Sequence, residues 1–261
     1  MFRTTAWRSL SAAPHRMLFF GGLLQVVAVM AFWTVELAGR YAVVGSPLAT
    51  TLASTWAHAF LMLYGTFPWF IFGFLMTTYP RWMRGPEVPR RFYIATFSLF
   101  AAGFLAFYVG LAVERWLVVV GIALVLGGWA SGFSALLWVY RRIEDGDRTY
   151  ERALNLALAV GGLGILGFLA AAAGLPQGYR LGVDLGLWGF LLPVLFLVSH
   201  RMIPFFTGCV IPGYNEYRPT WALLLLPGLA GGHVLLDLSG AVAWLWLRRK
   251  PCRSCTIDSS M

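Results

Sequence analysis

The stretch WLVVVGIALVLGGWASGFSALLWVY, residues 116–140, contains no charged side chain. About 20 apolar residues are enough for an α-helix to cross the hydrocarbon core of a bilayer. Comparable apolar runs lie on both sides of this stretch. They predict an all-α, polytopic transmembrane bundle of about seven helices, at residues 17–37, 56–79, 92–113, 116–140, 153–173, 183–207 and 220–247.

The composition supports a membrane protein. Hydrophobic residues make up 59% of the 261 residues and charged residues 12%, against about 25% charged in soluble domains. This balance excludes a soluble enzyme, and the chain has no alternating strands of the kind that form a membrane barrel. We therefore predict one membrane domain over residues 1–247, followed by a polar, disordered tail at 248–261. The pairs Gly128-x-x-x-Gly132 and Gly228-x-x-x-Gly232 predict close helix packing.

The net charge of +9 comes from nineteen Arg and one Lys against eleven acids. These basic residues form short clusters between apolar runs, which indicates membrane lipid, and not nucleic acid, as their partner. Thirteen of them lie before the first helix and in alternate connections after it, while the other connections hold only Arg40, Arg115 and Arg180. The positive-inside rule then predicts a cytoplasmic amino terminus. The basic end of the tail, from Arg248, conflicts with seven crossings, so either the last helix does not cross or the chain is a fragment.

The candidate site residues are the four histidines, His15, His58, His200 and His233. An ionisable group at membrane depth is costly and is a functional candidate by default. Imidazole is a common ligand of haem iron and of copper. Hydrogen bonding between helices is the alternative explanation, and the residues alone leave both open.

Two of these histidines have polar neighbours. His233 and Asp237 are four residues apart and share a helix face, so the carboxylate is positioned to orient a metal-bound imidazole, to serve a proton relay, or simply to form a polar pair. His200 and Arg201 precede Pro204, which removes a backbone donor and is expected to open the helix. Arg201 is a candidate partner of a haem propionate, with interfacial snorkelling as its alternative role.

Depth separates the histidines into two predicted sites. His58 begins its helix near the outer interface, and His200 is most of a bilayer away, so one cofactor cannot use both. We predict an inner site with His15, His200 and Arg201. The predicted outer site has His58 as a metal ligand, together with His233 and Asp237, although His233 lies nearer the middle of the membrane.

Several motifs resemble the NnrS family of bacterial inner-membrane proteins. They are His15-Arg16-x-Leu18-Phe19-Phe20, then His58-Ala59 leading through Met62-Leu63-Tyr64-Gly65 to Gly73-Phe74-Leu75-x-Thr77 and Pro80-x-Trp82, and finally Arg201-x-Ile203-Pro204-Phe205-Phe206-Thr207. Where many members have H-A-H-E, this chain has Phe60 and Leu61, so His58 is the one ligand carried over there.

The resemblance implies haem and copper as cofactors and a role in the response to nitric oxide and nitrosative stress, often alongside denitrification. It also implies a multi-pass protein of the bacterial inner membrane. Members have around twelve helices, so this chain corresponds to roughly the first half of that fold, and a truncated chain would explain its basic tail.

Three classes of function stay open at the level of the sequence. The first is the haem and copper protein that binds nitric oxide or another small diatomic ligand, with no catalytic residue of its own identified. The second is a transporter or channel whose polar path includes His233 and Asp237. The third is a subunit of a membrane redox enzyme that reduces nitric oxide or oxidises quinol. Non-enzymatic binding is favoured, because the closely spaced histidines of a dinuclear centre are missing.

Overall fold

The computed structural model describes residues 7–239, apart from residues 42, 44, 144–147, 216 and 220. Within these ranges the chain is helical and has no strands, which confirms the all-α prediction. Six helical segments are long and apolar enough to cross a membrane. They are Pro14–Arg40, Ser54–Trp82, Arg90–Ala112, Arg115–Tyr140, Thr149–Ala172 and Gln177–Val210.

Four of the six segments are single α-helices, and two are composite. The single helices are α2 (Pro14–Arg40), α5 (Arg90–Ala112), α6 (Arg115–Tyr140) and α7 (Thr149–Ala172). The second segment consists of α3 (Ser54–Phe60), the π-helix η1 (Leu61–Thr66) and α4 (Phe67–Trp82). The sixth consists of α8 (Gln177–Asp184), the π-helix η2 (Leu185–Leu191) and α9 (Leu192–Val210).

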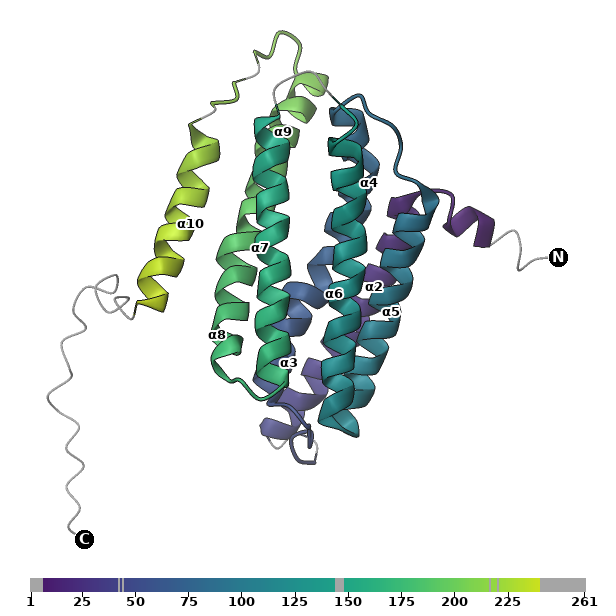
Figure 1. Ribbon diagram of the computed structural model, residues 1–261, viewed down its shortest axis with the longest axis vertical. Coiled ribbons are helices and arrows are strands. Elements are labelled where there is room, and N and C mark those ends of the chain that lie inside the picture. The colour runs from purple at the N-terminus through teal and green to yellow at the C-terminus, as the bar shows by residue number, and fades with distance from the viewer. Residues whose placement is uncertain are drawn as a thin grey trace, which may run out of the picture.

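The seventh predicted segment is helical over α10 (Ala222–Leu238). Its expected continuation to residue 247 and the tail at 248–261 lie outside the described residues. In Figure 1, α10 stands to one side of the other helices, and it contacts η2 and α9.

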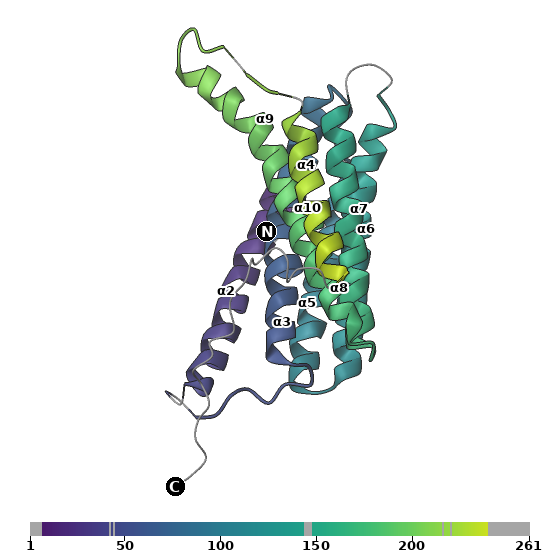
Figure 2. The same cartoon turned by 90° about the vertical axis from the view of Figure 1, so that its left-hand side faces the viewer.

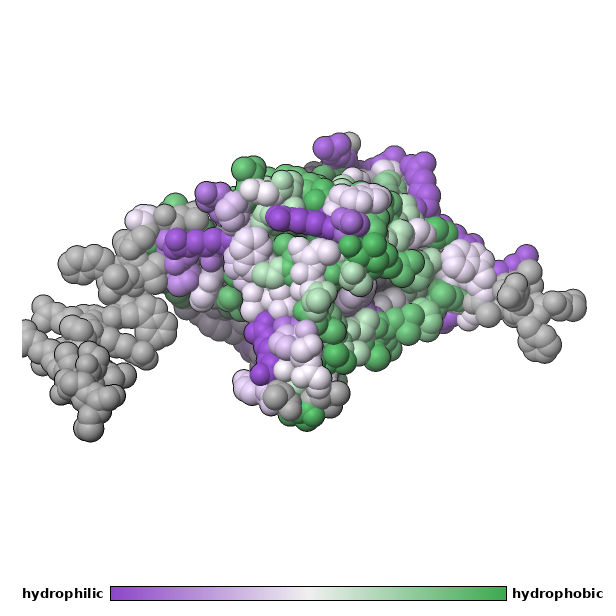
Figure 3. All heavy atoms as spheres, turned by 90° about the horizontal axis from the view of Figure 1, so that it is seen from below, coloured by the Kyte–Doolittle hydropathy of each residue, from purple (hydrophilic) through white to green (hydrophobic). Residues whose placement is uncertain are grey.

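Successive segments run in alternate directions along the bundle (Figures 1 and 2). We call the end at which α4, α6 and α9 terminate the upper end, and the end at which α2, α5 and α7 terminate the lower end. Figure 3 views the lower end, where hydrophilic residues are interspersed among hydrophobic ones. The connections rich in arginine therefore share the upper end, as the alternation of charge predicted.

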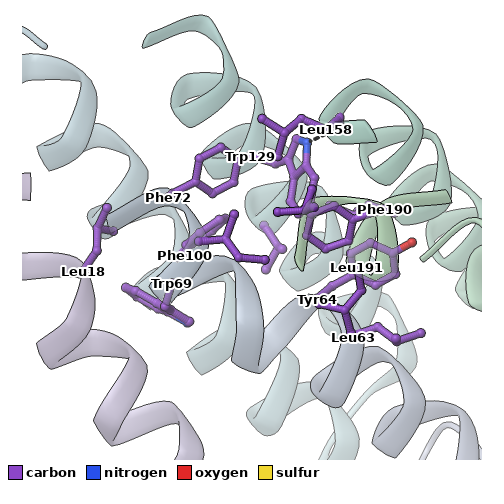
Figure 4. Close-up of a cluster of buried hydrophobic side chains, with 14 of the residues drawn as sticks. Leu18, Leu63, Tyr64, Trp69, Phe72, Phe100, Trp129, Leu158, Phe190 and Leu191 are labelled. Carbon is purple, nitrogen blue, oxygen red and sulfur yellow. Dashed lines mark hydrogen bonds between the residues drawn. The ribbon is translucent and has the colours of Figure 1, made fainter. Parts of the chain in front are cut away.

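The core is aromatic where the segments meet (Figure 4). Trp129 of α6 packs edge-on against Phe190 of η2 and Phe72 of α4, with ring centroids 4.7 and 5.2 Å apart. Its indole N–H donates to the carbonyl oxygen of Leu158 on α7 at 3.0 Å. Aromatic edge-to-face contacts together with a satisfied N–H allow such a large side chain to be fully buried.

Glycines set how closely the helices pack. A Cβ on Gly121 of α6 would lie 2.6 Å from the backbone nitrogen of Phe107, so α5 and α6 touch backbone to backbone. Cβ atoms on Gly128 and Gly132 would meet the rings of Phe100 and Phe72, which confirms that this pair serves packing. No atom of the described chain lies within 4 Å of the Cβ positions at Gly228 and Gly232, so that predicted packing is not seen here.

The two π-helices have the same local sequence pattern. Leu61-Met62-Leu63-Tyr64-Gly65 and Leu185-Gly186-Leu187-Trp188-Gly189 both read Leu-x-Leu-aromatic-Gly, and Pro68 and Pro193 follow them. Each proline lacks the N–H that would bond to the carbonyl four residues earlier, that of Tyr64 or Gly189, which favours a local change of helical pitch. The two π-helices contact each other inside the bundle.

Candidate functional site

His200 and Arg201 lie on α9 beside the first turn of α7. Arg201 Nη1 donates to Glu151 Oε1 at 2.8 Å, and the Glu151 side chain is only 5% exposed. The Arg201 guanidinium carbon also lies 4.7 and 5.4 Å from the ring centroids of Trp82 and Tyr150. Side chains from α4, α7 and α9 thus form one group, which we call the His200 cluster.

The two ring nitrogens of His200 have different surroundings. The Tyr150 hydroxyl is hydrogen-bonded to Nδ1, whereas Nε2 is buried with no hydrogen-bond partner among the described residues. A metal-bound histidine is usually held in this way, with its non-ligating nitrogen fixed by a second group. In that state Nδ1 donates its proton to the Tyr150 oxygen, and Nε2 presents its lone pair.

Polar contacts continue from the cluster into the bundle. Asn155 lies one helical turn after Glu151 on α7, and its Nδ2 donates to the Tyr79 hydroxyl at 3.0 Å. Both Asn155 and Tyr79 are buried. Tyr79 and Trp82 are one turn apart on α4, so this bond ties together the two helices that position Trp82 and Glu151.

The sequence predicted that Pro204 would open the helix locally, but the helix continues past this residue. The α9 helix runs from Leu192 to Val210 with Pro204 inside it. The proline lacks the N–H that would bond to the carbonyl of His200. Its effect is therefore one missing donor within a continuous helix, a smaller disturbance than an unwound segment.

Two hollows adjoin the His200 cluster. A hollow of about 10 Å³ beside Trp82 and Arg201 has no space for an organic cofactor. A cavity of about 590 Å³ lies between α7, η2, α9 and α10, and its lining is mostly apolar. Leu197, one turn before His200, lines both. The cavity reaches Arg152 and Thr149, which lie next to the cluster residues on α7.

His15 is at the upper end but not in the His200 cluster. Its Nδ1 lies 3.2 Å from the Thr77 hydroxyl on α4. Thr77 is on the side of α4 that packs against α2, whereas Tyr79, two residues later, faces α7. The α4 helix therefore stands between His15 and His200, and no contact joins the two rings among the described residues.

His58 lies in the lower half, on α3, at the far end from His200. Its ring stacks on the indole of Trp33 from α2, with centroids 3.9 Å apart and planes 13° from parallel. Its Nδ1 is buried and has no hydrogen-bond partner in the described chain. The predicted separation in depth between His58 and His200 agrees with these positions, while the ligand role of His58 remains a prediction.

His233 and Asp237 take different partners. His233 of α10 packs on Trp188 of η2, with ring centroids 4.1 Å apart. The Asp237 carboxylate forms an ion pair with Arg180 at 2.8 Å, and Arg180 lies 3.9 Å from Asp184. The predicted orientation of His233 by Asp237 is therefore not what the side chains show, because a fully charged guanidinium is the stronger partner for a carboxylate.

The described residues hold no group of three or more His, Cys, Asp or Glu side chains arranged to bind a metal ion. The described residues therefore offer no three-ligand site for a copper ion held by protein side chains alone. A haem needs only one or two axial histidines. His200, with its fixed Nδ1 and unpaired Nε2, fits that requirement.

Sequence reasoning missed Tyr150 and Glu151, the residues that complete the cluster. Both were assigned to a polar connection ending at residue 152, but α7 already begins at Thr149. A usable signal was present, because Glu151 and Asn155 are four residues apart and share one helix face. The sequence analysis also missed the π-helical segments, although their shared pattern is visible in the sequence.

Six apolar helical segments define a multi-pass helical membrane protein, which lies embedded in lipid. A family model described as NnrS protein matches residues 9–250. The chain therefore belongs to the NnrS family, as its motifs had indicated. No curated protein and no solved structure matches the chain.

Proposed function

We propose that the chain is a haem-binding protein of the bacterial inner membrane that acts in the response to nitric oxide and nitrosative stress. His200 is the proposed axial ligand. The observation that supports this assignment best is the His200 ring, whose Nδ1 is held by Tyr150 and whose buried Nε2 has no partner in the described chain. Membership of the NnrS family supports the physiological role.

The apolar cavity beside α9 is the proposed seat of the macrocycle. Its lining includes Leu197, one turn before His200, but not His200 itself, so the imidazole would have to turn towards the cavity to reach the iron. The cavity volume of about 590 Å³ and its mostly apolar lining suit a large, flat, hydrophobic group.

Arg152 lines the cavity and is the proposed partner of a propionate, although its Nε also donates to the Tyr140 hydroxyl at 3.3 Å. Arg201 was predicted for this role, but its guanidinium is already engaged by Glu151. Haem iron, when bound, supplies an open coordination position for a diatomic ligand such as nitric oxide.

The residues around His200 would hold its ligand nitrogen, Nε2, in place. Tyr150 orients the ring through Nδ1. Arg201 is ion-paired with Glu151, and its guanidinium covers the Tyr150 ring, which restricts the position of Tyr150. We therefore assign Tyr150, Glu151 and Arg201 as positioning residues. The family resemblance also implies copper, but the described residues present no three-ligand group for a copper ion.

The upper end is proposed to face the cytoplasm. The connections at this end carry most of the arginines, whereas Arg40, Arg115 and Arg180 belong to the lower end. Cytoplasmic loops of membrane proteins have this excess of basic residues. The His200 cluster would then lie in the inner half of the membrane.

Transport has weaker support in the described residues. Asp237, which a polar path would need, is ion-paired with Arg180, and the Arg180 side chain is 54% exposed. A dinuclear redox centre would need several clustered ligands, which the described residues do not contain. A transporter needs no axial ligand at His200, whereas a redox subunit could also carry haem, so a Soret band separates transport from the other two classes.

The test is haem occupancy in purified protein. The full chain is expressed in a haem-sufficient bacterium, purified in detergent, and assayed by absorption spectrum and by extraction of haem as its pyridine complex. We expect a Soret band in the parent protein and loss of most haem in His200→Ala. Tyr150→Phe should keep the haem but shift the spectrum, since it frees Nδ1 from its partner.

His58→Ala is the matched control, because it removes an imidazole that stacks on Trp33 at the far end of the bundle from His200. Elution volume and thermal midpoint establish that each variant is folded. A folded His200→Ala protein with full haem content and an unchanged spectrum would overturn the proposal. A parent protein without any haem, reconstituted or native, would do the same.

A further inference from the structure

A second hollow opens at the upper end, around the start of α2. It has a volume of about 340 Å³, and its lining includes Pro14, His15, Thr77, Arg81, Arg84 and Glu87. The α4 helix separates this hollow from the His200 cluster. The proposed haem site does not use it, so we call it the α2 pocket.

Positive charge dominates the α2 pocket. Arg81 and Arg84 line it, and neither guanidinium has a hydrogen-bond or ion-pair partner among the described residues. Glu87 is the one acid in the lining. Two unpaired arginines in one concave site present the forked donors that match the oxygen atoms of a phosphate group.

The amino end of α2 adds backbone donors to the same pocket. Ala13 is the N-cap residue and offers no side-chain hydrogen bond, and the first turn of α2 contains no acid. The first N–H groups of a helix have no intrahelical partner, and together with the helix dipole they attract anions. Pro14 has no N–H, so the free donors belong to the residues that follow it, beginning with His15, which lines the pocket.

His15 lines the same pocket and is held by Thr77. The Thr77 hydroxyl donates its single proton to the carbonyl oxygen of Gly73 at 2.8 Å. Thr77 must therefore accept from His15, so Nδ1 of His15 carries a proton. This bond fixes the orientation of the His15 ring.

The walls of the pocket are held in place. The Tyr93 hydroxyl of α5 donates to the carbonyl oxygen of Ser11 at 2.9 Å, and Arg90 donates to the Ser11 hydroxyl. These bonds anchor the chain that leads into Ala12 and Ala13. On the opposite wall, Gly85 N–H donates to the Pro80 carbonyl oxygen at 2.8 Å and closes the turn that carries Arg84.

We propose that the α2 pocket binds a phosphate group, through Arg81, Arg84 and the amino end of α2. Two sources supply this chemistry at the surface of a membrane, the headgroup of an anionic lipid and free phosphate. Basic pockets at the ends of transmembrane helices bind lipid headgroups in this manner. The proposal is independent of haem binding, and its test does not use haem content.

The experiment measures binding to the full chain in nanodiscs of phosphatidylcholine. One arm titrates inorganic phosphate by calorimetry, with chloride at the same ionic strength as reference. The other arm compares the retention of phosphatidic acid and of phosphatidylcholine by native mass spectrometry. Saturable binding of either phosphate source supports the proposal, and the arm that responds identifies the source.

Three variants locate the site. Arg81→Gln with Arg84→Gln should weaken binding at least about tenfold, since each removes charge-assisted hydrogen bonds. Arg91→Gln with Arg141→Gln removes the same charge from exposed positions at the same end and should leave binding within about twofold. Ala13→Asp should abolish binding by placing a carboxylate at the helix start.

Ala13→Asp also separates lost binding from lost folding. Ala13 has the extended backbone of an N-cap (φ −149°, ψ 148°), so aspartate there should cap α2 and raise the thermal midpoint while it blocks phosphate. Equal weakening by the two arginine pairs would overturn the proposal, because it would indicate diffuse surface charge. Absence of saturable binding in both arms, or full binding by Ala13→Asp, would overturn it as well.

Discussion

The Tyr64 hydroxyl donates a hydrogen bond to the carbonyl oxygen of Gly182, 3.0 Å away and 118 residues later in the chain. This bond connects η1 with the turn of α8 that leads into η2. Glycines on two neighbouring segments leave space for the Tyr64 hydroxyl. A Cβ on Gly186 would lie 2.6 Å from the Tyr64 oxygen, and one on Gly164 of α7 would overlap it. Three helical segments thus meet on one buried phenol.

Gly164→Ala should therefore destabilise the protein by about 1–3 kcal/mol, the usual cost of overpacking a core. Gly127→Ala is the control, because its Cβ would lie 3.7 Å from its nearest neighbour, Leu99, and alanine has the higher helix propensity. Thermal unfolding in detergent measures both. Tyr64→Phe should cost about 1 kcal/mol alone but should partly rescue Gly164→Ala, since it removes the overlapping oxygen. Absence of any rescue would count against the contact.

Glu151→Gln is expected to lower stability by about 2 kcal/mol. It leaves the Arg201 guanidinium without its carboxylate, in a pair whose acid is 5% exposed and whose base is 22% exposed. The cost lies below that of a fully buried pair because water reaches Arg201. The double variant with Arg201→Gln should be less destabilised than the sum of the two single variants.

The control for this pair is Arg180→Gln. It breaks the ion pair with Asp237 at a half-exposed arginine and should cost clearly less stability than Glu151→Gln. Equal losses for Glu151→Gln and Arg180→Gln would mean that the Glu151–Arg201 pair is not specially protected from solvent.

The membrane-spanning segments could be predicted from the sequence because hydropathy over about 20 residues reports directly on the bilayer. His200 and Arg201 were found for a related reason, since two costly polar groups in an apolar helix need an explanation. Glu151 was missed because it was assigned to the polar connection before α7, where an acid is ordinary. Its burial follows from Arg201, 50 residues later, which no local pattern reveals.

The pairing of histidines could not be predicted from depth alone. His15 and His200 share the upper end, as expected, but α4 lies between them. Depth gives the position of a residue along the membrane normal only. The position of its helix in the membrane plane depends on side-chain packing. Local spacing has a similar limit: Asp237 shares a helix face with His233, but its carboxylate pairs with Arg180 of another segment.

His58→Ala should leave haem occupancy unchanged. His58 is on α3 near the lower end and stacks on Trp33, whereas His200 is near the end of α9 at the opposite side of the bundle. Haem and copper contents, measured separately in the purified variant, check this. Loss of copper alone would support a second site at His58. Loss of haem to the level of His200→Ala would instead assign the haem to the lower half.

Cysteine labelling should place the upper end in the cytoplasm. The exposed positions Glu87 and Arg141 report on the upper end, and Tyr41 and Leu175 on the lower end. Each is replaced by Cys in a chain whose three native cysteines are changed to Ser. A membrane-impermeant maleimide should label Tyr41→Cys and Leu175→Cys in intact cells, but Glu87→Cys and Arg141→Cys only after lysis, because the arginine-rich connections resist translocation.

The opposite labelling pattern would reverse the orientation and put the His200 cluster in the outer half of the membrane. The α2 pocket would then face the periplasm, and anionic lipid of the cytoplasmic leaflet would be removed from its candidate ligands. Labelling of all four positions from outside would contradict the alternation of the segments itself, since Tyr41 and Glu87 lie at the two ends of one membrane-spanning segment, Ser54–Trp82. The four positions together therefore test both the orientation and the number of crossings between them.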